Sequence, residues 1–279
     1  MKNTSVQEVV AELLAYYQVN KRSMPWRNSG QDGQYDPYKI MVSEIMLQQT
    51  QVSRVIPKYE AFLTEFPDVA TLAAAPLAAV ISQWQGLGYN RRAKFLWQAA
   101  GMIMADYDGV FPDSTDQLQK LPGIGVNTAG AICAYAYDQP VVFIETNIRT
   151  VFIHHFFAGH DAVVDKQITP LVGEMLAAWQ SVSGLGAREY YWALMDYGTF
   201  LKTSQGNSAR RSTAYTKQSK FEGSRRQVRG AVLRHLTAGP STVEQLNDII
   251  TDERLLSVCE ELAGEGLITQ QGTVLTLGG

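Results

Sequence analysis

Apolar residues recur three and four positions apart along most of the chain, which is the spacing that forms one face of an α-helix. Proline residues fall between these periodic segments, where helices end. The pattern predicts helices over 38–49, 52–66, 77–84, 91–107, 115–121, 127–137, 147–157, 168–182 and 187–201, preceded by an amphipathic helix that spans Val6 to Tyr17. Because no alternating strand pattern occurs before residue 265, we predict an all-α fold.

The C-terminal quarter follows a different pattern. Residues 203–223 are rich in Ser, Thr, Gln, Gly and basic residues, which predicts a long loop. Helical spacing returns over 228–236, 242–250 and 253–264, and short strands are expected at 267–269 and 274–276 around a Gln-Gly turn. Three helices and a hairpin indicate a small winged-helix-like module at 224–279, a fold that binds DNA in many proteins and is only structural in others.

Composition limits the class of protein. The 279 residues are 46% hydrophobic, which is enough for two or three compact units. No run of 18 apolar residues and no signal-peptide core is present, so we expect no membrane span and a cytoplasmic location. The two cysteines, Cys133 and Cys259, lie far apart in the sequence, which excludes a disulfide framework and a cysteine-rich metal site.

Charge is distributed unevenly along the chain. The net charge of −3 argues weakly against a nucleic-acid partner, but residues 202–234 contain nine basic residues and one acid, Glu222. Such a cluster can neutralise phosphate groups and release their counterions. The alternative is a flexible, solvated linker that is basic by chance.

The segment Leu121–Gly125 reads Leu-Pro-Gly-Ile-Gly and lies between two predicted helices. Two glycines allow a tight turn, and the amides of the turn and of the next helix start can hold a phosphate without a basic side chain. A turn of this kind is a weak signal alone, but the small-residue helix that opens at Thr128 strengthens it.

Two glutamates are candidate catalytic residues because of where they lie in the predicted helices. Glu145 follows the apolar run 141–144 and stands with Asn147 at a predicted helix N-terminus, where helix capping is the alternative role. Glu44 lies among apolar positions of a predicted helix. A partly buried carboxyl there has a raised pKa, as a general acid needs, and the alternative is a solvent-exposed helical glutamate.

Taken in order, these segments resemble the adenine DNA glycosylases of the MutY type, in the helix–hairpin–helix superfamily. The similarity covers roughly residues 6–275, and its most specific parts are 46–50 (Met-Leu-Gln-Gln-Thr) and 86–89 (Gly-Leu-Gly-Tyr). It implies a two-lobed helical fold that binds DNA between the lobes. One lobe would be 28–137, with the helix–hairpin–helix at 114–137, the other 1–27 plus 138–201, followed by a basic loop at 202–223.

The resemblance also implies roles for single residues. Glu44 would protonate a flipped adenine and then handle water, Glu145 would stabilise the oxocarbenium-like sugar, and Asn147 would orient Glu44. Cleavage of an N-glycosidic bond needs this pair of carboxyl groups, and the base must first leave the stack. The residues expected to contact DNA are Gln48, Gln49, Tyr89, Pro122, Gly123, Ile124, Gly125, Asn127, Thr128, Arg210 and Arg211.

The sequence departs from the family at the active site. The family has Asp where this chain has Glu145, and the extra methylene displaces a carboxylate by about 1 Å, which can cost on the order of 100-fold in rate. Asn127 occupies the place where bifunctional relatives carry a lysine nucleophile, so a monofunctional enzyme is expected.

A further departure concerns the cofactor of the family. Most relatives hold a [4Fe–4S] cluster with four cysteines after the last helix, whereas 202–218 contains no cysteine and has Ala209, Ser212 and Gln218 at the matching spacing. We therefore expect no iron–sulfur cluster, no other metal and no cofactor. We also expect no counterpart of the pyrophosphohydrolase-like domain that long relatives carry.

The expected function is removal of adenine paired with 8-oxoguanine or guanine by a monomer that binds duplex DNA with a mismatch or oxidised guanine and binds no membrane. A thymine or uracil mismatch glycosylase of the same superfamily is one alternative, and residues 46–50 argue against it. A DNA-lesion-binding protein with weakened catalysis is the other, favoured by Glu145 and by the missing cluster cysteines.

Overall fold

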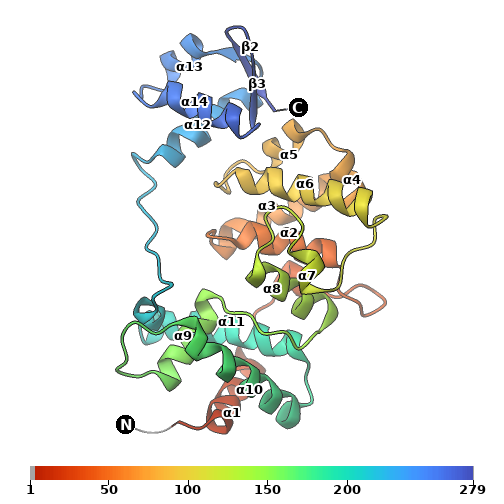
Figure 1. The fold of residues 1–279 in the computed structure, drawn as a ribbon, viewed down its shortest axis with the longest axis vertical. Helices are drawn as coiled ribbons and strands as arrows, with labels where there is room; N and C mark the ends of the chain where they lie inside the picture. The colour runs from red at the N-terminus through yellow and green to blue at the C-terminus, as the bar shows by residue number, and fades with distance from the viewer. Residues whose placement is uncertain (1–3, 279) are drawn as a thin grey trace. The chain divides into compact units, whose positions relative to one another are not determined.

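The computed structural model describes residues 4–278, and most of this stretch is helical (Figure 1). The helices up to residue 204 are α1 (Val6–Asn20), η1 (Pro25–Arg27), α2 (Pro37–Leu47), α3 (Val52–Glu65), α4 (Val69–Ala74), α5 (Leu77–Gln83), α6 (Arg91–Asp106), α7 (Thr115–Leu118), α8 (Val126–Tyr137), α9 (Thr146–Phe156), α10 (Asp165–Ser183) and α11 (Ala187–Ser204). The helices predicted from apolar spacing are all present. Two helices in this part of the chain, η1 and α4, were not predicted, because three and six residues are too few to show a period.

The chain forms two compact units. The first contains Met1–Ile40, Asp113–Gln119 and Ile124–Lys217, and the second contains Met41–Pro112, Lys120–Gly123 and Gln218–Gly279. Each unit therefore combines segments that are distant in sequence. The lobe boundaries derived from the sequence stay a prediction.

The first unit is built on aromatic packing around α9, α10 and α11. Trp179, Tyr190, Tyr191 and Phe152 are fully buried there. The buried carboxylate of Asp196 on α11 binds the guanidinium groups of the segment before α2, with Arg22 at 2.6 Å and Arg27 at 2.8 Å. These paired charges attach the N-terminal segment to α11, because a buried carboxylate is tolerated only with such partners.

The second unit ends in the C-terminal module, shown in blue in Figure 1. It consists of α12 (Arg225–Thr237), β1 (Ser241–Thr242), α13 (Val243–Ile249), α14 (Leu255–Gly264), β2 (Ile268–Gln271) and β3 (Val274–Leu277). The strands form an antiparallel sheet of order β1-β3-β2. The hairpin β2–β3 was predicted, whereas β1 was missed because its two residues show no alternation.

The hydrophobic core of the C-terminal module includes residues from outside the module. Val232, Leu236, Val258 and Leu275 belong to one buried cluster that also contains Leu77 and Ile81 of α5. Burial of shared apolar surface holds the module on α5. Within residues 4–278 no helix is both long and apolar enough to cross a bilayer.

Candidate functional site

In the second unit, the C-terminal end of α2 carries Glu44 and the residues that follow it. Glu44 is half-buried within the helix, and its neighbours Ser43 and Ile45 are fully buried. Beyond the helix end, Gln49 adopts φ of 56°, and on the neighbouring loop Tyr89 adopts φ of 49°. Left-handed backbone is uncommon and costly for residues other than glycine, and it persists only where the surroundings enforce it. Two residues predicted to probe the DNA are therefore held in strained conformations.

The guanidinium group of Arg92 is what enforces this geometry. It donates to five carbonyl oxygens and a hydroxyl: Ile45 at 2.7 Å, Met46 at 2.9 Å, Gln48 at 2.6 Å, Leu87 at 3.3 Å, Gly88 at 3.0 Å and Thr50 Oγ1 at 3.0 Å. Burial lowers the pKa of Arg92 to about 10, so it remains a cation at neutral pH. A cation is stabilised by the carbonyl groups at a helix C-terminus, and here it fixes the end of α2 against the loop that carries Tyr89.

Sequence reasoning missed Arg92, although a signal was present. Arg92 lies on the same helical face as the buried residues Leu96, Ala99 and Ile103 of α6. A basic residue in an apolar stripe is rarely tolerated without many hydrogen-bond acceptors. Such a position therefore indicates a structural clamp before any contact is known.

In the first unit, Glu145 occupies the N-cap position of α9 in extended conformation. Its carbonyl accepts from the amide of Arg149 at 2.9 Å, but its side chain does not cap the helix. Burial raises the pKa of Glu145 to about 7, against an opposing effect of the Arg149 cation. Arg149 is itself bound to both carboxylate oxygens of Asp165, at 2.7 and 2.6 Å. The capping role considered for Glu145 is wrong, which leaves its carboxyl group for other chemistry.

Asn147 lies in the first turn of α9 and is half-buried. The helix α11 crosses α9 at this point through Gly198, where an added Cβ would lie 2.4 Å from the Asn147 carbonyl oxygen. Only glycine permits an approach of this kind. Gly198 therefore sets the position of the turn that carries Glu145 and Asn147, a role that sequence reasoning did not identify.

The predicted hairpin lies between α7 and α8. Gly123 has φ of 78°, and a Cβ added there would lie 2.7 Å from Cβ of Phe95; the turn therefore requires glycine for two reasons. Ile124 is buried, while Gly125, the N-cap of α8, is exposed. The exposed Asn127 accepts a hydrogen bond from the amide of Ile144 at 3.3 Å, so its side chain helps to hold the segment that leads to Glu145. The expected contacts of Pro122 and Thr128 with phosphate stay predictions.

Comparison with known proteins decides the family. Residues 42–171 match the model of the HhH-GPD superfamily base excision DNA repair protein. An adenine DNA glycosylase from Mycolicibacterium smegmatis is 33% identical over 287 residues, covering 93% of this chain and 92% of the relative. The chain belongs to the adenine DNA glycosylase family. A relative with the same name from Mycobacterium tuberculosis is 32% identical and covers 92% of this chain and 89% of the relative.

Solved structures confirm the fold of this glycosylase. A thermostable thymine-DNA glycosylase superposes with a TM-score of 0.60 at 21% identity, over 73% of this chain and 90% of that one. An endonuclease III bound non-covalently to DNA superposes with a TM-score of 0.56 at 16% identity, over 72% and 86%. The resemblance stated from the sequence and the predicted helix–hairpin–helix glycosylase fold are both confirmed.

Residues 202–218 correspond to the segment in which most relatives bind the [4Fe–4S] cluster, and in this glycosylase hydrogen bonds hold part of the segment against α9. Arg211, in η2 (Ser208–Arg211), donates to the carbonyls of Phe157 at 2.9 Å and Ile153 at 3.3 Å, at the C-terminal end of α9. The amide of Val163 donates to the Arg211 carbonyl at 2.9 Å. Arg211 thus has a structural role, while Arg210 is exposed. Contacts of either arginine with DNA stay predictions.

The residues present do not fit a [4Fe–4S] cluster. Residues 202–218 contain no cysteine, and both cysteines of the chain, Cys133 and Cys259, are buried in helices of different units. Among residues 4–278, no group of three or more His, Cys, Asp or Glu side chains is arranged to hold a metal ion. Since the cluster requires thiolate ligands, we derive no step of the reaction through it.

Proposed function

We propose that this glycosylase removes adenine paired with 8-oxoguanine or guanine in duplex DNA, acting as a monomer that hydrolyses the N-glycosidic bond and leaves the backbone intact. The observation that carries the proposal is the near full-length similarity to adenine DNA glycosylases, joined to an acid within the clamped helix α2. The site residues below are assigned from the family pattern and from their surroundings.

Glu44 is the general acid of the proposed reaction. It gives its proton to a ring nitrogen of the flipped adenine, so that the base leaves as a neutral molecule, and it then accepts a proton from the attacking water. Its place in α2 supports this role, because the helix end is fixed by Arg92. A general acid contributes about 100-fold to 10,000-fold when it is held within hydrogen-bonding reach of its target.

Glu145 is the second carboxyl group, and it acts as an anion. As the bond to adenine breaks, positive charge develops on the sugar, and a carboxylate in a desolvated environment stabilises that charge. Because burial raises the pKa of Glu145 to about 7, only part of the enzyme carries the active anion at neutral pH. Asn127 supplies no amine, so no Schiff base forms on it, and Asn147 is assigned to the orientation of Glu44.

DNA is gripped through backbone amides and probed by fixed side chains. The two glycines of the turn, Gly123 and Gly125, and the first residues of α8 are exposed, which suits the binding of a phosphate group by backbone amides. Gln48, Gln49 and Tyr89 enter the space left by the flipped base. Their strained or clamped conformations support this role, since rigid residues lose little entropy when they wedge into a duplex.

The test is a substrate panel. Labelled duplexes that contain adenine, thymine or uracil opposite 8-oxoguanine or guanine are incubated with the protein and then cleaved at abasic sites with alkali. Strand cleavage only for the adenine duplexes is expected, with none for the Glu44→Gln variant and no borohydride-trapped adduct. Cleavage with thymine or uracil instead supports the mismatch-glycosylase alternative, and tight binding without cleavage supports a lesion-binding protein.

A further inference from the structure

The C-terminal module carries its positive charge on one helix. Of the five arginine and lysine residues between 224 and 279, four are on α12 (Arg225, Arg226, Arg229 and Arg234), against seven acidic residues in the same segment. The fifth, Arg254, is bound by Asp252 at 2.6 Å. If the module touches a nucleic acid, α12 is the element with the charge to do so.

The elements that winged-helix modules use for DNA are unsuited to it here. In helix-turn-helix proteins the second helix of the motif enters the major groove, and in this module that helix is α14. It contains no basic residue and carries Glu260 and Glu261. The loop between β2 and β3 is also uncharged, and the exposed Gln271 ends β2 directly before it. Both elements would bring repulsion or no charge to a phosphate backbone.

The second unit contains a groove that α12 shares with the site described above. Its volume is about 910 Å³, and Gln48, Gln49 and Tyr89 line it together with Arg226 and Arg234 of α12. Six arginines line the groove and Glu265 is the one acid among the lining residues. This positive lining matches the charge of a phosphodiester backbone.

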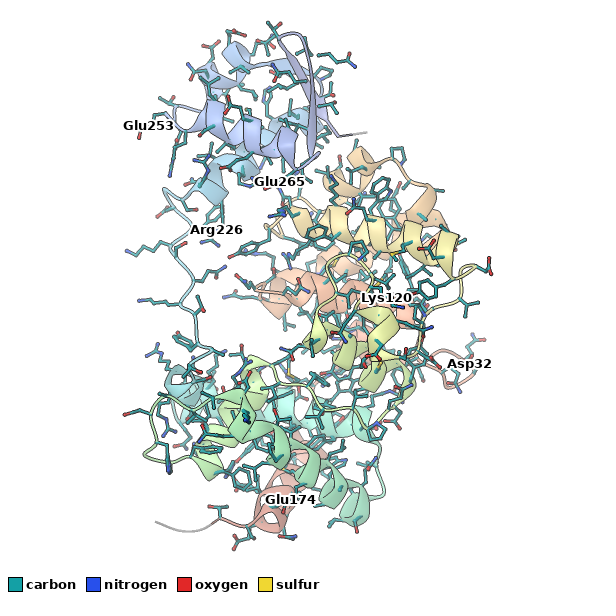
Figure 2. All side chains as sticks on the ribbon, viewed as in Figure 1. Asp32, Lys120, Glu174, Arg226, Glu253 and Glu265 are labelled. Atoms are coloured by element: carbon teal, nitrogen blue, oxygen red, sulfur yellow. The ribbon has the colours of Figure 1, made fainter. Side chains whose placement is uncertain are left out.

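Direct contacts join α12 to Tyr89. Arg226 donates from its guanidinium to the Tyr89 hydroxyl at 2.8 Å, and the guanidinium carbon lies 5.3 Å from the centroid of the Tyr89 ring. Figure 2 shows Arg226 and Glu265 on the side of the module nearer to α6, with Glu253 on another side. Arg225 and Arg234, toward the two ends of α12, differ in whether they form an ion pair. Arg225 binds Glu261, whereas the exposed Arg234 has no ion pair with any residue in the described range 4–278.

We propose that this groove binds the phosphodiester backbone of the DNA strand that carries the base opposite the excised adenine, and that α12, not α14 or the β2–β3 loop, is the DNA-binding face of the module. The proposal rests on the proposed function for the choice of strand, because Tyr89 is assigned there to the orphan base. Arg234 and Arg226 supply the cations, and the fixed distance from α12 to Tyr89 sets the register of that strand.

The first experiment compares two variants with the same change in net charge on different faces: Arg234→Gln on α12 and Gln271→Glu at the end of β2, beside the β2–β3 loop. Fluorescence anisotropy measures binding of the full chain to a duplex with a stable abasic analogue opposite 8-oxoguanine, over a series of salt concentrations. We expect Arg234→Gln to lower affinity by about 3-fold to 10-fold and to reduce the salt slope by about one unit. Gln271→Glu should change affinity less than about 2-fold, since it adds charge away from the phosphates.

Equal losses in the two variants, or no loss for Arg234→Gln, would overturn the assignment of α12. Binding is scored without catalysis, so this result is separate from the substrate panel. If adenine is not excised, the proposed function fails, but the binding comparison still decides whether α12 is the DNA-binding face.

The second experiment identifies the strand. Neutral methylphosphonate linkages are placed beside the 8-oxoguanine in one duplex and beside the abasic analogue in another. The affinity penalty of Arg234→Gln should disappear in the first duplex and persist in the second, because only the first removes the phosphate charge that Arg234 meets. The reverse result would show that the groove holds the target strand and would refute the proposal.

Discussion

The C-terminal end of α2 and the N-terminus of α9 each offer one glutamate in contrasting environments. Glu44 lies inside a helix whose last carbonyl groups are bound by Arg92. Glu145 lies just outside the first turn of α9, where the helix dipole favours an anion, yet burial raises its pKa to about 7. The comparison shows that two chemically identical groups have different surroundings, and the proposed mechanism assigns them different roles on that basis. In the proposed reaction, Glu44 donates a proton, and Glu145 supplies a negative charge that is present only when its carboxyl group is ionised.

The largest expected effect comes from removal of the acid. Glu44→Gln keeps the shape of the side chain and removes the proton that adenine needs, so single-turnover excision should fall by about 1,000-fold. Binding to a duplex with an abasic analogue should stay within a few-fold of the unmodified protein. If the variant excises adenine at more than a tenth of the original rate, the assignment of Glu44 is wrong.

Glu145→Gln removes the charge but keeps the shape at the other carboxyl group. The rate should fall by about 100-fold to 1,000-fold, because one preorganised charge is lost from the transition state. Stability should change in the opposite direction. The folded pKa of Glu145 is raised to about 7 from 4.5, so the folded protein holds its proton in the pH range where the unfolded chain releases it.

The resulting cost to the fold grows from pH 4.5 to 7 and is complete above pH 7, where it reaches up to about 3 kcal/mol. Glu145→Gln should therefore raise the melting temperature at pH 8 and leave it almost unchanged at pH 4.5. A melting temperature that is equal or lower at pH 8 would contradict the raised pKa.

Arg92→Ala tests whether the α2 end depends on its clamp. The variant leaves buried carbonyl groups without donors and should lower the free energy of unfolding by about 3 kcal/mol, measured by chemical denaturation. The matched control is Arg91→Ala, the exposed neighbour 3.9 Å from Glu265, which should cost less than about 0.5 kcal/mol. Similar losses in the two variants would show that the hydrogen bonds of Arg92 do not hold the site.

The smallest effect separates two adjacent arginines. Arg211→Ala removes two hydrogen bonds to the end of α9 and should cost about 1–2 kcal/mol in the free energy of unfolding. Arg210→Ala should leave stability unchanged and lower duplex affinity by a few-fold, with a smaller salt slope. The prediction of a DNA contact for this segment would be withdrawn if Arg210→Ala left both affinity and salt slope unchanged.

Apolar spacing was sufficient to predict the helices, because burial of one face dominates their formation. It did not reveal η1, α4, η2 or β1, which contain two to six residues and are stabilised by local caps or by neighbours. Asp68, for example, starts α4 by accepting a hydrogen bond from the amide of Thr71 at 2.8 Å. Such contacts become visible only once the surrounding chain is in place.

In the candidate site, too, some features could be predicted from the sequence and others could not. The position of Glu145 at a helix N-terminus and the tight turn at the hairpin glycines could be predicted, because each depends on residues that are close together in the sequence. The hydrogen-bond partners of Arg92 on α2 and the crossing of α11 over α9 at Gly198 could not, since both depend on residues more than 40 positions away. The pKa of Glu145 also depends on burial, which no short segment encodes.

The most direct test of the contrast between the two glutamates is the pH dependence of adenine release from a duplex with adenine opposite 8-oxoguanine, under single-turnover conditions. Because the anion is the proposed active form of Glu145, and loss of the Glu44 proton slows both proteins alike, the rate of the unmodified protein divided by that of Glu145→Gln should rise with pH through a midpoint near 7. A ratio that stays constant between pH 5 and 8 would contradict the account.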